Sequence, residues 1–200
     1  FAEVPAGLGR VLADRGFTAL TDIQRAVITP GLADRDLRIS SQTGSGKTVA
    51  LGLVVASEVA AAVATGRHGA GPARPAVLLV APTRELAVQL AGELRWLFAP
   101  LGAEVASVTG GTSVEGDLRL LRRRPPVLVG TPGRLVDHLR RGSLALDGVT
   151  VVALDEADEM LALGFAEEVS AILDATPSQR RTHLVSATFP AAVRAVADRA

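Results

Sequence analysis

The chain has 200 residues, no net charge at pH 7, 48% hydrophobic residues and no cysteine. This composition excludes a disordered chain, a disulfide-stapled module and a cysteine-ligated metal site. Zero net charge argues against binding of nucleic acid through the overall charge of the chain, so any such binding needs a local basic patch. We see no signal peptide and no apolar run near the ~20 residues of a membrane span, and we expect a cytoplasmic protein that contacts no membrane.

Apolar runs and helical patterns alternate along the chain. A strand at 37–40 precedes a glycine-rich loop and a helix from 47 to about 63. Further strands are expected at 76–81, 104–109, 127–130, 150–154 and 182–186. Helices are expected at 84–98, after 113, at 135–141, in short pieces up to 174, and after 190. This alternation predicts one α/β domain, a parallel sheet sandwiched by helices, with its ligand at the carboxyl ends of the strands.

The loop SSQTGSGKT, residues 40–48, holds the only lysine, whereas the other twenty basic residues are arginine. Its glycines let backbone N–H groups point inward at an anion, next to a helix N-terminus. Lys47 is a compact charge for the β- and γ-phosphates, and the Thr48 hydroxyl suits Mg²⁺. An ordinary glycine-rich turn is the alternative, and Ser41 stands where the strict phosphate-loop pattern has glycine. The predicted nucleotide-binding residues of this loop are Thr43, Gly44, Ser45, Gly46, Lys47 and Thr48.

A phosphate loop also predicts an acidic partner at the end of another apolar strand, and VTVVALDEAD, residues 149–158, supplies it. Asp155 leaves the strand end, where it can hold Mg²⁺ through water. Glu156 is placed to orient and activate the attacking water of a nucleoside triphosphatase. Lys47, Asp155 and Glu156 are therefore the candidate catalytic residues, although acidic residues after a strand also begin ordinary helices.

The letters DEAD at 155–158 resemble the signature of the DEAD-box RNA helicases. Six more strings resemble that family's motifs in its order: GFTALTDIQ (16–24), SQTGSGKT (41–48), PTREL (82–86), GG (110–111), TPGR (131–134) and SAT (186–188). The resemblance implies the first RecA-like P-loop NTPase domain over residues 1–200, binding ATP and Mg²⁺. It also implies a second RecA-like domain, carrying an arginine finger, that these residues do not include.

The resemblance implies that the motif at 16–24 reads adenine. The Gln24 carboxamide can pair with the amino group and a ring nitrogen of adenine, a match that guanine does not offer. Phe17 offers a ring near the base, with core packing as its alternative. The family pattern has prolines where Leu20 and Asp22 stand, which loosens the expected adenine selectivity.

The resemblance also implies an RNA-facing set that contacts phosphate and sugar without reading sequence. With only 3% aromatic residues, a base-stacking platform is not expected. Arg134 has an alternative role as a helix-start arginine. Ser186 and Thr188 are expected to bond Asp158 and couple the nucleotide state to strand separation. The RNA-facing set comprises Pro82, Thr83, Arg84, Gly110, Gly111, Thr131 and Arg134.

Other features have a structural interpretation first. The basic run RLLRRRPP, 119–126, is favoured as a solvated helix end over an RNA contact. We interpret His68, His138 and His183 as structural or surface residues. The preferred function is an ATP-dependent RNA helicase. Two other hypotheses stay open: another strand–loop–helix NTPase such as a DNA translocase, and a non-catalytic, ATP-dependent RNA clamp.

Overall fold

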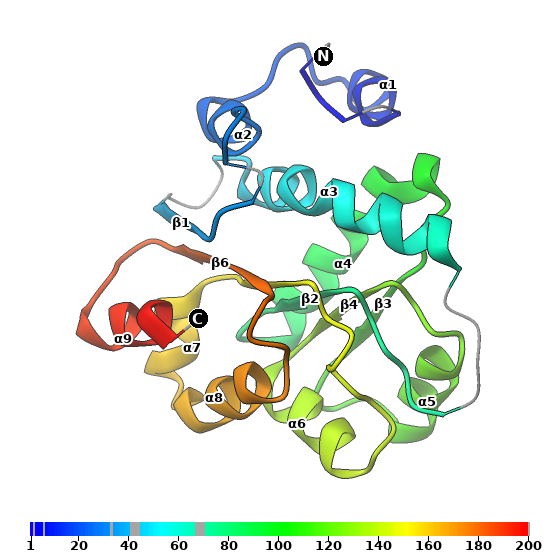
Figure 1. Ribbon diagram of the computed structural model, residues 1–200, viewed down its shortest axis with the longest axis vertical. Coiled ribbons are helices and arrows are strands. Elements are labelled where there is room, and N and C mark those ends of the chain that lie inside the picture. Colours follow the sequence, from blue (N-terminus) through cyan, green and yellow to red (C-terminus); the bar gives the residue numbers. More distant parts are fainter. Residues whose placement is uncertain (2, 6, 33, 41–44, 67–70, 200) are drawn as a thin grey trace.

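Short runs of valine, leucine and alanine form the strands of a parallel sheet (Figure 1). The computed structural model describes residues 1–200 except 2, 6, 33, 41–44, 67–70 and 200, and the side chain of residue 199. Within them the sheet has six strands, in the spatial order β1 (Leu37–Ser40), β6 (Arg181–Ser186), β5 (Val151–Leu154), β2 (Val77–Val80), β4 (Val127–Gly130) and β3 (Val105–Val108). Every pairing is parallel, which confirms the predicted fold class.

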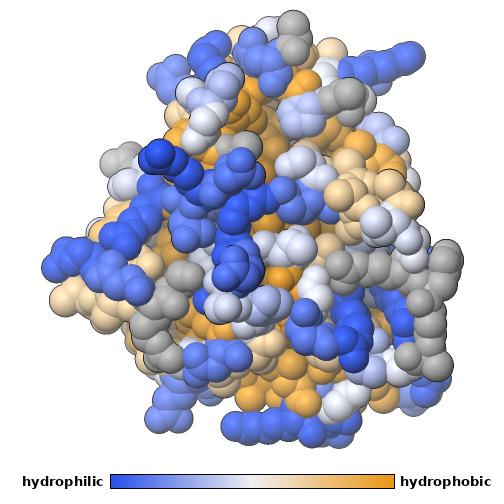
Figure 2. All heavy atoms as spheres, in the orientation of Figure 1, coloured by the Kyte–Doolittle hydropathy of each residue, from blue (hydrophilic) through white to orange (hydrophobic). Residues whose placement is uncertain are grey.

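Helices cover both faces of the sheet, and alternate residues of each strand enter one of two cores. Val77 and Leu79 of β2 belong to the first core, and Leu78 and Val80 to the second. The first core is covered by α1 (Leu8–Asp14), α2 (Asp22–Val27), α3 (Lys47–Thr65), α4 (Arg84–Phe98) and the 3-10 turn η1 (Ala99–Leu101). The second is covered by α5 (Val114–Arg122), α6 (Pro132–Arg140), α7 (Ala157–Ala162), α8 (Ala166–Asp174) and α9 (Ala191–Arg199). Figure 2 shows hydrophilic side chains both at the outline and across the middle of this face, with patches of hydrophobic ones between them.

Some element boundaries differ from the sequence predictions. Helix α6 begins at Pro132 rather than residue 135, because proline is pre-organised for the first helical position and needs no N–H partner there. Helix α3 ends at Thr65, where the threonine hydroxyl donates to the carbonyls of Ala61 and Ala62. Helices α1 and α2 were not predicted. Both are short, with six or seven residues, and only packing against α3 and α4 makes helices of that length stable.

The expectation about membrane-length segments was wrong for α3. Its 19 residues, with a mean hydropathy of 1.9 in the most apolar window, are long and apolar enough to cross a bilayer. More than half of that window is buried inside the protein, where α3 packs against α2 and α4. Its apolar character is that of a core helix between layers.

Two histidines are buried in unlike surroundings. The ring nitrogens of His138 lie 2.9 Å from Ser143 Oγ and 3.1 Å from Asp117 Oδ2. His183 on β6 is fully buried, and neither of its ring nitrogens has a hydrogen-bond partner among the described residues. Burial, with a smaller contribution from the nearby Arg181 charge, lowers the pKa of His183 to about 4. His68 lies outside the described residues.

We expect His183 to make the fold sensitive to mild acid. Because its pKa is depressed in the folded chain, the unfolded chain alone binds a proton between about pH 6.5 and pH 4, and this proton uptake removes up to about 3 kcal/mol of stability. Urea unfolding of the wild type and of His183→Leu, at pH 7.5 and pH 5, measures this contribution. The variant should lose clearly less stability between the two pH values, and an equal loss in both proteins would contradict the assignment.

Candidate nucleotide-binding and catalytic site

The end of the phosphate loop and the start of α3 place Lys47 at the carboxyl edge of the sheet. Gly46 precedes the helix with φ +87°, and a Cβ at this position would lie 2.5 Å from Gln24 Nε2. Glycine is therefore required both by its backbone conformation and by the close approach of Gln24. Thr48 is half-buried in the first turn of α3. Thr43 and Gly44, which the sequence also assigns to the phosphate loop, lie outside the described residues.

The side chains of Lys47 and Glu156 form an ion pair across the site. Lys47 Nζ lies 2.6 Å from Glu156 Oε1, and the two side chains are only 8% and 17% exposed. Glu156 has φ 51° and ψ 53°, a left-handed conformation that costs a non-glycine residue about 1 kcal/mol or more. This backbone turn directs the carboxylate back toward α3. The two predicted catalytic residues, 109 positions apart in the sequence, are therefore in direct contact.

Asp155 is the last predicted catalytic residue, one position after β5. Its side chain is almost buried, and its Oδ1 has no hydrogen-bond partner among the described residues. Burial, and to a smaller degree the adjacent Glu156 charge, raise the pKa of Asp155 to about 6 against the opposing effect of Lys47. A buried carboxylate oxygen that the protein leaves unpaired is suited to a cation, directly or through water. Asp155 thus has the chemistry that a magnesium site requires.

Asp158 connects this loop to the segment after β6. Thr188 donates to Asp158 Oδ2 from its hydroxyl at 2.7 Å and from its backbone N–H at 3.0 Å. The Asp158 backbone N–H donates to Ser186 Oγ at 3.2 Å, and that hydroxyl donates to the Thr188 carbonyl. Partial burial would raise the pKa of Asp158, but the hydrogen bonds from Thr188 and Ser186 outweigh it and lower the pKa. The expected contact between these three residues is present.

Gln24 is tied to the phosphate loop rather than open to solvent. Its side chain is fully buried, its Oε1 accepts from the Thr21 N–H at 3.0 Å, and its Nε2 donates to the Gly46 carbonyl at 3.3 Å. The Thr21 hydroxyl donates to the Ser45 carbonyl at 3.1 Å. Thr21 and Gln24 also form a capping box at the start of α2. Thr21 was not among the predicted site residues, although the T-x-x-Q spacing is the signal for such a box.

Phe17 lies against the first core and not in an open position. Its ring centroid is 6.1 Å from that of Trp96 on α4, and Arg15 covers the Trp96 ring at 4.8 Å. This arrangement corresponds to the core-packing alternative for Phe17.

Most of the predicted RNA-facing residues come together at the carboxyl ends of β2, β3 and β4. Arg84 Nη1 lies 3.5 Å from the Gly111 carbonyl, and the Gly110 N–H donates to Thr131 Oγ1 at 3.3 Å. Thr83 caps α4 by accepting from the Leu86 N–H, and Pro82 is buried before it. Arg84, Gly110 and Gly111 are exposed, so they form the outer surface of this group.

Arg134 differs from the rest of this group, because its guanidinium is turned inward. It donates to the Thr112 carbonyl at 2.6 Å and pairs with Asp117 at 3.4 Å, and its side chain is only 9% exposed. Asp117 also contacts His138 and accepts from the Thr112 hydroxyl. Arg134 therefore braces the 110–112 loop from beneath instead of presenting its charge to solvent. Asp117 and His138 were missed as parts of this brace, and no local pattern marks residues so far apart in the sequence.

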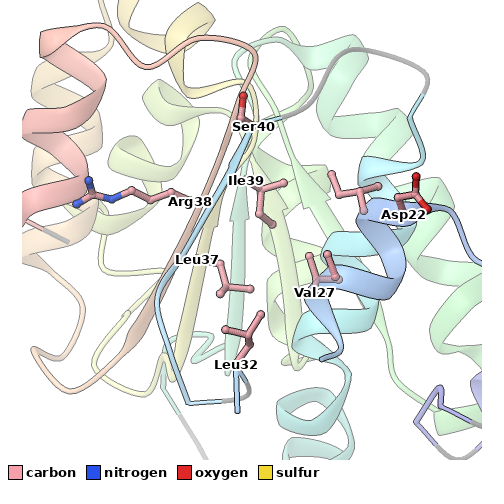
Figure 3. Close-up of a pocket in the computed structure, with 9 residues that line it drawn as sticks. Asp22, Val27, Leu32, Leu37, Arg38, Ile39 and Ser40 are labelled. Carbon is pink, nitrogen blue, oxygen red and sulfur yellow. The ribbon is translucent and has the colours of Figure 1, made fainter. Parts of the chain in front are cut away.

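A separate cavity of about 410 Å³ opens between α2 and β1 (Figure 3). Val27, Leu32, Leu37 and Ile39 form its apolar walls, and Ser40 lies at one end. Lys47, Asp155 and Glu156 do not line it. The cavity is therefore distinct from the polar site at the carboxyl edge.

Comparison with known proteins identifies the group to which this geometry belongs. The sequence matches the DEAD/DEAH box helicase family over residues 21–196. The chain is a member of that family. It is 43% identical over 184 residues to the DEAD-box ATP-dependent RNA helicase CshA of Geobacillus kaustophilus, a match that covers 92% of this chain and 38% of the relative. The CshA of Bacillus subtilis is 38% identical over 199 residues, or 98% of this chain and 38% of the relative.

Solved structures of helicases share the fold of this DEAD/DEAH box chain. The RNA helicase Prp28 from Chaetomium thermophilum bound to ADP superposes with a TM-score of 0.85 at 36% identity, covering 98% of this chain and 46% of that one. A hypothetical ATP-dependent RNA helicase from Sulfolobus tokodaii gives 0.81 at 31% identity, covering 96% and 53%. The fold is thus RecA-like, and the chain spans about two fifths of the length of the CshA relatives.

We expect the raised pKa of Asp155 to make magnesium-dependent nucleotide binding weaken in mild acid. As the pH falls through about 6, Asp155 takes up a proton and loses the charge that holds a cation, and affinity falls by up to about tenfold per pH unit. The measurement is the Mg²⁺-nucleotide affinity of the wild type relative to Asp155→Asn from about pH 8 to pH 5. The nucleotide's own titration cancels in this ratio. A ratio that stays constant would show that Asp155 does not contribute through its charge.

Proposed function

We propose that this chain is the ATP-binding half of an ATP-dependent RNA helicase. The observation that carries the proposal is the contact of Lys47 with Glu156 beside the unpaired Asp155 oxygen. ATP hydrolysis requires a cation for the phosphates, a carboxylate for the attacking water and a carboxylate for a metal, and this site holds all three kinds of group. The relatives named ATP-dependent RNA helicases and the ADP-bound Prp28 support the same function.

In the proposed reaction, Lys47 leaves Glu156 and binds the terminal phosphates of ATP. The ammonium exchanges one anionic partner for another, so it stays neutralised in a buried position. The released Glu156 carboxylate orients a water molecule toward the γ-phosphorus and accepts its proton. As the water oxygen bonds to this phosphorus, the bond from the phosphorus to the β,γ-bridging oxygen breaks and ADP leaves with that oxygen. Asp155 and Thr48 would hold Mg²⁺, whose charge stabilises the phosphate oxygens when it is bound.

Asp158 provides the proposed connection between nucleotide and RNA. It lies two positions after Glu156 and shares three hydrogen bonds with Ser186 and Thr188. A shift of the 155–158 loop on hydrolysis therefore moves the segment after β6. In the longer protein, that segment and the exposed Arg84 and 110–111 surface would hold one side of the RNA backbone, and a second RecA-like domain would hold the other.

We expect Glu156→Gln to separate binding from hydrolysis. The amide keeps the size of the side chain and can still contact Lys47, but it no longer accepts a proton from water. ATP affinity should change by less than about fivefold, while hydrolysis in the longer protein should fall by about 10²-fold or more. Glu159→Gln, an exposed carboxylate three positions later, is the matched control and should leave both unchanged. Unchanged hydrolysis by Glu156→Gln would refute the role of Glu156.

We expect these 200 residues to bind ATP but to hydrolyse it slowly and to unwind no duplex. An arginine finger from a second domain stabilises transition-state charge and contributes about 10³–10⁵ in rate. The measurement is the steady-state rate of ATP hydrolysis with and without single-stranded RNA. The rate should be close to zero for this chain under both conditions, and single-stranded RNA should raise it for the protein extended through the following domain. Equal rates would place a complete site within this chain, and equal stimulation by single-stranded DNA would favour a DNA translocase. RNA binding that needs ATP without turnover would favour an RNA clamp.

A further inference from the structure

The amino-terminal edge of the sheet, opposite the catalytic residues, has a cavity that Arg122 lines and that further arginines adjoin. In a parallel sheet with helical crossovers, helices end where the next strand begins, so α5 and α6 end at this edge. A cavity of about 260 Å³ lies between the two helix ends and residues 71–73. Its apolar wall consists of Pro72, Ala73, Leu118 and Leu121.

The arginines of this edge are only partly neutralised. We define the basic rim as Arg122, which lines the cavity, Arg124, which contacts the lining residue Gly71, and Arg140 and Arg141, which directly precede the lining residue Gly142. Arg141 pairs with Asp137 at 2.8 Å. Arg122 and Arg140 are exposed and form no ion pair among the described residues, and Arg124 donates to a carbonyl and not to a carboxylate.

Neighbouring arginines of the same sequence run behave differently. Arg119 pairs with Glu115 at 3.3 Å, and Arg123 pairs with Glu104 at 2.8 Å. The excess positive charge is therefore concentrated on the side of the run that borders the cavity. The carbonyl groups at the C-terminal ends of α5 and α6 stabilise cations at these positions. Rim arginines are therefore favourable here even where they form no salt bridge.

The backbone of Arg124, at this edge, has a left-handed conformation. Its φ is +57°, and among the described residues only Glu156 is another non-glycine residue with a positive φ. The position directly follows the end of α5, where the Arg124 N–H donates to the Leu121 carbonyl at 2.9 Å and where glycine is usually preferred. The side chain offsets this cost by donating to the Gly71 carbonyl at 2.8 Å, which fixes the loop that forms one wall of the cavity.

We propose that this cavity and its basic rim bind an acidic segment of a partner protein. One apolar side chain of the segment enters the cavity, and carboxylates on both sides of that side chain contact the rim arginines. The apolar wall favours a protein segment over RNA as the occupant. Bases stack on aromatic rings or guanidinium planes, and Arg122 is the one lining residue of either kind. Guanidinium groups bind carboxylates in bidentate pairs, and an apolar anchor in a hollow supplies the contact that exposed charges alone do not. Because the edge lies opposite the catalytic residues, the partner and the nucleotide can be bound together.

The test uses the ¹⁵N-labelled chain and a synthetic peptide with one leucine between two runs of three glutamates. The peptide should bind saturably and shift the amide signals of Leu118, Leu121 and Gly142. Replacing the peptide leucine by glycine, or the rim by Arg122→Glu with Arg140→Glu, should weaken binding at least tenfold. The matched control is Arg10→Glu with Arg35→Glu, which makes the same charge change at exposed positions outside the basic rim and should bind like the wild type.

Two further measurements separate the possible results. ATP affinity of the rim variant should equal that of the wild type, which shows that the fold and the catalytic edge are intact. Binding of a uridine dodecamer should also be unchanged. The proposal is overturned if the wild type does not bind the peptide, if the control variant loses binding to the same extent, or if the rim variant loses the dodecamer instead, which would make this edge an RNA contact.

Discussion

The site depends on the contact between Lys47 and Glu156, because it joins two segments that only the parallel sheet brings together. Lys47 begins the helix that follows β1, and Glu156 lies in the turn that follows β5. Between β1 and β5 in the sheet lies β6, whose exit carries Ser186. One ordering of three strands therefore places Lys47, Glu156 and the Asp158 partners at one edge.

The positions on either side of this contact are held by hydrogen bonds from polar groups of neighbouring segments. Gln24 holds the Gly46 carbonyl from the side of α2, and Thr188 holds Asp158 from the side of β6. The left-handed backbone of Glu156 is stable because β5, on one side, is fully buried and α7, on the other, packs into the second core. The rigid elements on both sides of Glu156 thus hold its backbone in a strained conformation. Such strain is expected where the position of a side chain requires backbone angles that the residue would not adopt by itself.

The sequence carried much of this information because the fold relies on local patterns. Apolar runs, several of them bounded by glycine or proline, located the strands, and the phosphate loop and DEAD strings located the polar edge. What it did not predict depends on contacts between distant residues. The inward turn of Arg134 follows from Asp117 and Thr112 beneath it, 17 and 22 positions away, and the fully buried position of Gln24 follows from its bond to Gly46. Helices α1 and α2 are too short to be stable without α3 and α4. The capping box of Thr21 and Gln24 marks the start of α2, but it does not by itself make a helix of six residues stable.

The same topology also explains why the two edges of the sheet differ in chemistry. Helix N-termini gather at the carboxyl edge, where their partial positive charge favours anions, and helix C-termini gather at the other edge, where carbonyl groups favour cations. The carboxylates of Asp155 and Glu156 lie at this edge although helix N-termini there attract anions from outside, and the Lys47 ammonium beside them compensates part of their charge. A bound phosphate would take over Lys47, and a bound metal would take over the carboxylate charge. The arginines after α5 and α6 follow the second tendency and need no such partner, which leaves Arg122 and Arg140 able to pair with groups outside the chain. At the carboxyl edge one ion pair lies beside an unpaired Asp155 oxygen, which a cation would complete. The opposite edge carries exposed arginines beside an apolar hollow, which an acidic partner with an apolar side chain would complete.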